Sequence, residues 1–129
     1  FEVLAKTQRL VFDFCANTNA DVFYQLIRAV GPQRILFGSD LPITRMRMRR
    51  VCESGNYVNV VPKGLYGDVS GDSHMREVVG REAEKLTFFM YEEIDAMRRA
   101  AEKAKLKRKD IESMFYGNAE RVIAAASRI

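Results

Sequence analysis

The stretch Arg34-Ile35-Leu36-Phe37-Gly38-Ser39-Asp40-Leu41-Pro42 decides the fold class of this chain. Its first half is a continuous apolar run, which is typical of a strand covered on both faces in a parallel sheet. Functional groups of parallel α/β folds gather at the carboxyl ends of such strands, where Asp40 stands. A carboxylate there can bind a divalent cation or accept a proton from a metal-bound water, although Gly-Ser-Asp also suits a turn or a helix cap.

The residues before this stretch predict a strand and a helix. Residues 9–14 form a β-type run, and apolar residues recur at helical spacing from Val22 to Val30. Gly31 and Pro32 then end the helix. Strand, helix and strand over residues 9–40 make a βαβ unit, whose two strands run parallel.

The residues after this stretch change in character. Residues 41–80 hold several glycines and prolines and predict a long insertion loop, with one short strand near residues 58–61. The apolar spacing then predicts a long helix over residues 81–105 and a short one over residues 108–115. Gly117 is expected to break the chain, and Asn118 to cap a last helix that ends near residue 127.

Length and composition describe an ordinary globular domain of 129 residues, with 47% hydrophobic and 29% charged residues. The net charge of +4 permits binding to nucleic acid but does not demand it. Cys15 and Cys52 are too far apart for a CxxC motif, and two reduced thiols indicate a cytoplasmic protein. No apolar run approaches the length of a membrane span, so we expect no membrane association.

Two further side chains are candidates for substrate binding. Arg45 begins the run of Arg45, Arg47, Arg49 and Arg50 and lies nearest to Asp40, so it could clamp a substrate carboxylate, since arginine pairs bidentately with carboxylates. A solvated basic face is the competing interpretation of this run. His74, in the insertion, could contact substrate or carry a proton, or it could be a surface histidine.

Three segments resemble one family. Residues 31–42, GPQRILFGSDLP, are similar to the last barrel strand of the metal-dependent amidohydrolase superfamily, in its amidohydrolase-2 branch. Residues 110–123, from Asp110-Ile111-Glu112 to Phe115-Tyr116-Gly117-Asn118-Ala119-Glu120-Arg121-Val122-Ile123, resemble the closing helices of that branch. Residues 87–101 look like the long helix of some members.

The resemblance implies an α/β fold, the C-terminal portion of a (β/α)8 TIM barrel with about two parallel strands and a helical C-terminal extension. In that family the matching aspartate is a metal ligand and often the acid/base, which gives both roles to Asp40. The family also uses a His-x-His pair and two more strand-end histidines, whereas this chain has one histidine. Residues 1–129 are therefore expected to be the C-terminal part of one barrel domain, inactive alone.

The function that follows is expected of the longer protein of which residues 1–129 would be the C-terminal part. It is a metal-dependent hydrolase, with zinc as the divalent metal, acting through a metal-activated water on a C–N, ester, lactone or carboxylate-bearing small molecule. One alternative is a non-oxidative decarboxylase of the same branch, and another is a small basic, non-enzymatic nucleic-acid-binding module. The hydrolase interpretation expects no nucleic-acid partner, but either the missing N-terminal part of the barrel or a second copy of the chain.

Overall fold

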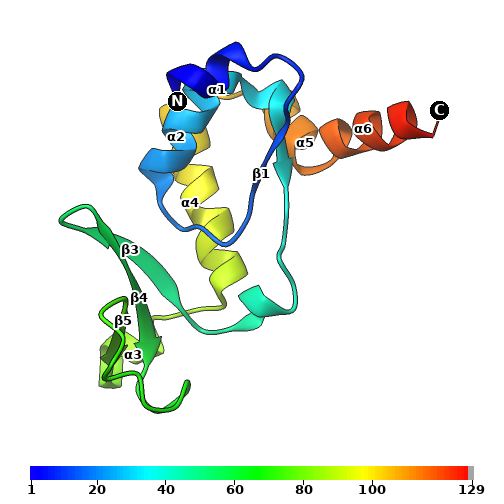
Figure 1. Cartoon of the computed structure of the whole chain (residues 1–129). Coiled ribbons are helices and arrows are strands. Elements are labelled where there is room, and N and C mark those ends of the chain that lie inside the picture. The colour runs from blue at the N-terminus through cyan, green and yellow to red at the C-terminus, as the bar shows by residue number, and fades with distance from the viewer. Residues whose placement is uncertain (128–129) are drawn as a thin grey trace. The chain divides into compact units, whose positions relative to one another are not determined.

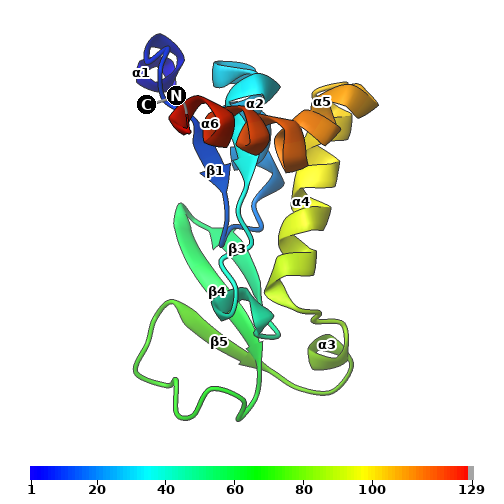
Figure 2. The same cartoon turned by 90° about the vertical axis from the view of Figure 1, so that its right-hand side faces the viewer.

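The computed structural model describes residues 1–127, which form two compact units. The first unit comprises Phe1–Cys15, Ala20–Gly38 and the chain from Met97 onward. The second comprises Ala16–Asn19 and Ser39–Ala96. Each unit is described by itself, and Figures 1 and 2 label most of the helices and strands of both.

The first unit begins with the predicted βαβ arrangement. Its elements are α1 (Glu2–Lys6), β1 (Phe12–Phe14), α2 (Ala20–Val30), η1 (a 3-10 turn, Pro32–Arg34) and β2 (Ile35–Phe37). Strands β1 and β2 pair in parallel, with Phe12 opposite Ile35. The apolar face of α2 is buried, which confirms the helical spacing that the sequence predicts.

The C-terminal helices complete the first unit. They are α5 (Arg108–Glu112), a π-helical turn η3 (Ser113–Gly117) and α6 (Asn118–Ala126). The ring of Phe14 contacts the rings of Phe23, Phe37 and Phe115, with centroids 5.5 to 5.6 Å apart. This aromatic cluster joins the strand pair, the helix between the strands and the π-helical turn in one core.

The predicted cap at Asn118 is wrong. The backbone of Gly117 is helical, with φ −65° and ψ −29°, so the chain does not break there. The Asn118 side chain is fully buried, and its amide donates hydrogen bonds to the carbonyls of Pro32 and Ile35, at 2.8 and 2.7 Å. The Asn118 side chain therefore bonds distant backbone carbonyls and does not cap its own helix.

The second unit contains a three-stranded mixed sheet where the sequence predicts a loop over residues 41–80. Strand β3 (Arg49–Glu53) runs antiparallel to β4 (Asn56–Pro62), and β4 runs parallel to β5 (Met75–Val78). A two-residue turn, Ser54-Gly55, joins the first two strands with φ of 51° and 83°. Arginines and asparagines interrupt the apolar alternation of these strands, which explains why their pattern resembles that of a loop.

The predicted helix over residues 81–105 is two helices, α3 (Gly80–Glu84) and α4 (Phe89–Lys103). Between them the backbone pairs with another segment. The N–H of Met48 donates to the carbonyl of Thr87 at 3.3 Å, and the N–H of Phe89 donates to the carbonyl of Met46 at 2.8 Å. These long-range bonds draw residues 85–88 out of the helix.

Each face of the three-stranded sheet packs against its own apolar cluster. Val60 and Val78 pack with Leu86 on one face. Met48 and Val61 pack with Phe89 on the other. Residues two apart in a strand share a face, so this alternation assigns the intervening side chains to a face as well.

The mixed α/β class, the parallel strand pair and the helical C-terminus are confirmed. The strands of residues 1–127 form a two-stranded and a three-stranded sheet and do not close a barrel. That the chain is the C-terminal portion of a (β/α)8 barrel stays a prediction. Within the same residues, no helix combines the length and apolar character needed to cross a membrane.

Candidate functional site

A cavity of about 360 Å³ lies in the second unit. Most of its walls are apolar, with side chains of Met46, Met48, Val61 and Phe89. Four lining residues carry polar groups: Asp40, Arg50, Asn59 and Tyr66. A small apolar cavity with a few convergent polar groups is typical of small-molecule sites.

The carboxylate of Asp40 is carried by a tight turn after β2. Its backbone has a φ of 48°, a left-handed conformation that aspartate tolerates better than most residues. The buried Thr44 secures this turn, since its N–H donates to the carbonyl of Asp40 at 3.2 Å and its hydroxyl donates to the carbonyl of Ser39. The Asp40 side chain is exposed and makes no ion pair within residues 1–127.

The arginine run is not a uniform solvated face. Arg47 donates to the carbonyls of Leu86 and Ala83, at 3.1 and 2.7 Å. Arg49 forms an ion pair with Glu92 at 2.8 Å. Arg50 lines the cavity that Asp40 also lines. Along this extended segment Arg47 and Arg49 lie on one face and Arg50 on the other, and each of the three has different partners.

The ion pair between Arg49 and Glu92 shifts both groups in the expected direction. Partial burial alone would raise the pKa of the Glu92 carboxyl, but hydrogen bonds from Arg49 and Thr87 outweigh it and hold that pKa below its ordinary value. The hydrogen bond to Glu92 raises the pKa of the Arg49 guanidinium. Both groups therefore stay charged, and the pair ties β3 to the first turn of α4.

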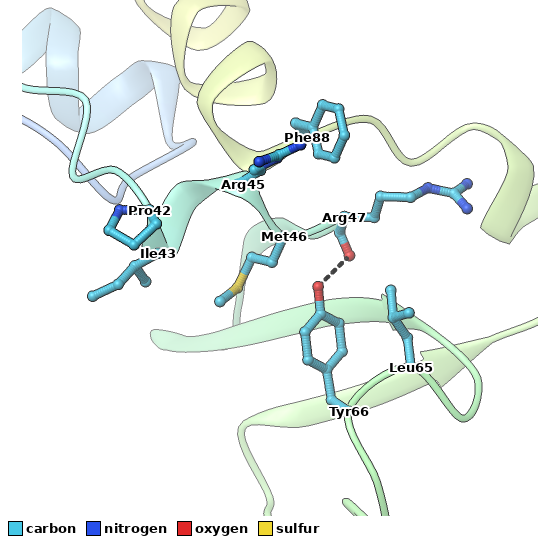
Figure 3. Close-up of a pocket in the computed structure, with 8 residues that line it drawn as sticks. All are labelled: Pro42, Ile43, Arg45, Met46, Arg47, Leu65, Tyr66 and Phe88. Carbon is cyan, nitrogen blue, oxygen red and sulfur yellow. Dashed lines mark hydrogen bonds between the residues drawn. The ribbon is translucent and has the colours of Figure 1, made fainter.

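Arg45 lines a second and more open hollow of about 580 Å³ (Figure 3). Ile43, Met46 and Tyr66 line both spaces, so the hollow adjoins the cavity of Asp40. The hydroxyl of Tyr66 donates to the carbonyl of Arg47 at 3.4 Å, and partial burial raises the pKa of this phenol. Arg45 itself is exposed and does not line the smaller cavity.

The structure does not bring His74 to the cavity of Asp40. Its ring stacks on Tyr57, with centroids 4.3 Å apart and planes 19° apart. Its Nδ1 lies 2.8 Å from the carbonyl oxygen of Tyr57. Neither the cavity nor the adjoining hollow includes His74 among its lining residues, so its predicted contact with substrate gains no support.

Sequence reasoning missed Asn59, and within the arginine run it favoured Arg45 over Arg50. Arg50 and Asn59 lie opposite each other on β3 and β4, and Met75 lies opposite Asn59 on β5. All three line the cavity, so they form a row across the sheet. The signal was present as an arginine two residues after Met48, but it is readable only once residues 46–53 are known to be extended.

A metal site is not complete within residues 1–127. No group of three or more His, Cys, Asp or Glu side chains among them could hold a metal ion. Asp40 alone does not make such a site, so these residues do not fit a catalytic metal by themselves. Any metal bound at Asp40 needs ligands from elsewhere.

Comparisons of the chain with protein-family models, with curated proteins and with solved structures found no match. Membership in the amidohydrolase superfamily therefore stays a prediction, which rests on residues 31–42, 87–101 and 110–123.

Proposed function

We propose that this chain forms the C-terminal part of a metal-dependent hydrolase of the amidohydrolase-2 kind. Its substrate would be a small molecule with a C–N, ester or lactone bond or a carboxylate. The observation that carries this proposal is Asp40, which follows the parallel strand β2 and lines a small, mainly apolar cavity. The family resemblance of the residues around Asp40 adds the reaction class.

The geometry suits proton transfer by Asp40. Its carboxylate can accept the proton of a water that attacks a carbonyl carbon and can return it to the departing amine or alkoxide, so that bond making and bond breaking balance. The apolar walls reduce the contact of a bound substrate with water. Zinc is the metal that the resemblance implies, and its other ligands would come from outside residues 1–127.

The proposal places the enzyme in the cytoplasm. Cys15 and Cys52 form no disulfide, which suits a reducing compartment. Decarboxylation of an acid bound in the same cavity is the alternative reaction, since that branch of the family includes it.

The proposal predicts that Asp40→Asn in the full-length protein lowers kcat by about 10²- to 10⁴-fold, the usual contribution of a general acid or base. Asparagine keeps the shape of the side chain and tolerates the left-handed backbone of residue 40. Turnover of a panel of amides, lactones and aromatic acids measures this effect. Glu84→Gln, at an exposed carboxylate of α3, is the matched control and should keep full activity.

Two readouts separate the outcomes. Incorporation of ¹⁸O from labelled water into the product identifies hydrolysis, whereas release of CO₂ without such incorporation identifies decarboxylation. Unchanged turnover in Asp40→Asn would refute the assignment of Asp40.

A further inference from the structure

One face of the three-stranded sheet presents a cation to the cavity. Met48, just before β3, and Arg50, within it, lie on one side of the sheet, and Asn59 and Val61 of β4 lie on the same side. The flanking residues Met48 and Val61 are almost fully buried. Arg50 therefore stands in a mainly apolar surface, where an unpaired charge is costly.

The backbone of Arg50 is held in place by Thr18. The hydroxyl of this buried threonine accepts the N–H of Arg50 at 3.0 Å and donates to the carbonyl of the same residue. The Thr18 hydroxyl thus bonds both the N–H and the carbonyl of Arg50. These two bonds fix the position of the Arg50 backbone, from which its side chain extends.

The guanidinium of Arg50 is also held in place. Its Nε donates to Oδ1 of Asn59 at 2.9 Å, and its Nη1 donates to the carbonyl of Ala16 at 2.7 Å. Its Cζ lies 5.0 Å from the ring centroid of Tyr57 and 5.4 Å from that of Phe89, within the range of cation–π attraction. A group fixed in this way loses little entropy when a ligand binds.

These contacts include no ion pair. All its hydrogen-bond acceptors are neutral, and no carboxylate of residues 1–127 lies within 4 Å of it. Within the same residues its Nη2 has no acceptor. Arg47 and Arg49, by contrast, are occupied by carbonyls and by Glu92.

We propose that Arg50 is the anion-binding residue of this cavity and takes the carboxylate of a compact, otherwise apolar substrate through Nη2. The inference rests on the proposed function only for the reaction that follows binding. It replaces Arg45 as the substrate clamp, because Arg45 does not line this cavity. A ligand whose carboxylate binds Arg50 would pack its apolar part against Met48, Val61 and Phe89.

Calorimetry with the full-length protein tests the proposal, using benzoate and its neutral analogue benzamide as probes. Wild type should bind benzoate at least about tenfold more tightly than benzamide, because only benzoate forms a charge-assisted pair. Arg50→Met should lose that preference, and Arg50→Lys should keep part of it, because lysine retains the charge but not the planar fork. Arg45→Met is the control and should bind like wild type.

The outcomes are distinct from those of the proposed function. Equal affinity for the two probes in wild type, or an unchanged preference for benzoate in a folded Arg50→Met, overturns the inference. Benzoate binding that depends on Arg50, in a protein without hydrolase or decarboxylase activity, supports the inference and overturns the function. Asp40→Asn should not weaken benzoate binding, because it removes a like charge from the same cavity; weaker binding in that variant would contradict the assignment.

Discussion

Asn118 is a polar side chain in the interior of the first unit. It is fully buried and bonds two carbonyls, one from the 3-10 turn η1 and one from β2. Its own Oδ1 accepts a hydrogen bond from Arg121 at 3.1 Å, and Arg121 also donates to the carbonyl of Gln33. One residue of α6 thereby satisfies the backbone where the strand β2 begins.

We expect Asn118→Ala to lower the free energy of unfolding by about 2–4 kcal/mol, because each buried carbonyl left without a donor costs about 1–3 kcal/mol. Urea denaturation followed by circular dichroism measures the loss. The control is Gln8→Ala, which removes an exposed amide and should change stability by less than about 0.5 kcal/mol. A loss for Asn118→Ala as small as that of the control would contradict the role given to its two hydrogen bonds.

The two-residue turn between β3 and β4 sets the pairing of these strands. Ser54 and Gly55 both have positive φ, as a type I′ turn requires. The turn fixes the register that places Arg50 opposite Asn59. Asn-Gly is the preferred pair for this turn, so the natural serine is not the optimum.

We therefore expect Ser54→Asn to raise the free energy of unfolding by a few tenths of a kcal/mol and Gly55→Ala to lower it by about 1 kcal/mol, since a side chain is strained at φ 83°. Thermal melts of the two variants measure both changes. Gly71→Ala serves as the control, because the backbone there is not left-handed and a Cβ meets no atom within 4 Å. A stabilising Gly55→Ala would show that the turn has another conformation in solution.

Elements whose pattern is local and apolar were predictable from the sequence. The run at Ile35–Phe37 and the spacing of α2 predict β2 and the preceding helix because the residues that specify them lie within a few positions of each other. Strand β5 and the interruption before α4 depend on pairing with distant residues, such as Met46 with Phe89. Local pattern could therefore not reveal them, and for the same reason it could not show which arginine of the run lines the cavity.

At the scale of the whole molecule, several carboxyl groups make stability depend on pH. The pKa of Asp21 is lowered by its hydrogen bond and charge interaction with Lys103, and the pKa of Glu92 is lowered by its hydrogen bonds from Arg49 and Thr87, which outweigh burial. A folded-state pKa below the unfolded one means that the unfolded chain binds more protons in acid. The stabilisation is complete above the pKa of the unfolded chain and is lost as the pH falls through the lower pKa of the folded protein.

We expect the free energy of unfolding to fall progressively below about pH 5. Glu92→Gln should be less stable than wild type at pH 7, and the difference should shrink as the pH falls through the lowered pKa of Glu92, because the glutamate of wild type then becomes protonated. Denaturation at several pH values measures this convergence. Glu84→Gln is the control, because it alters an exposed carboxylate without a protein partner within residues 1–127, and its free energy of unfolding should follow that of wild type at every pH. A difference in stability between Glu92→Gln and wild type that stays constant with pH would contradict the lowered pKa of Glu92.

The alternation along residues 46–50 has a consequence for how such a protein can change during evolution. The turn at Ser54-Gly55 holds residues 49–53 in register with β4, so deleting Met48 alone would turn the residues before it to the opposite face of the sheet. Arg47 would then take the place of Met48 in the cavity wall, and Met46 would leave that wall. Deleting Arg47 and Met48 together would preserve the faces. Changes of length in this segment should therefore be tolerated in steps of two residues, whereas a single step changes which side chains line the cavity.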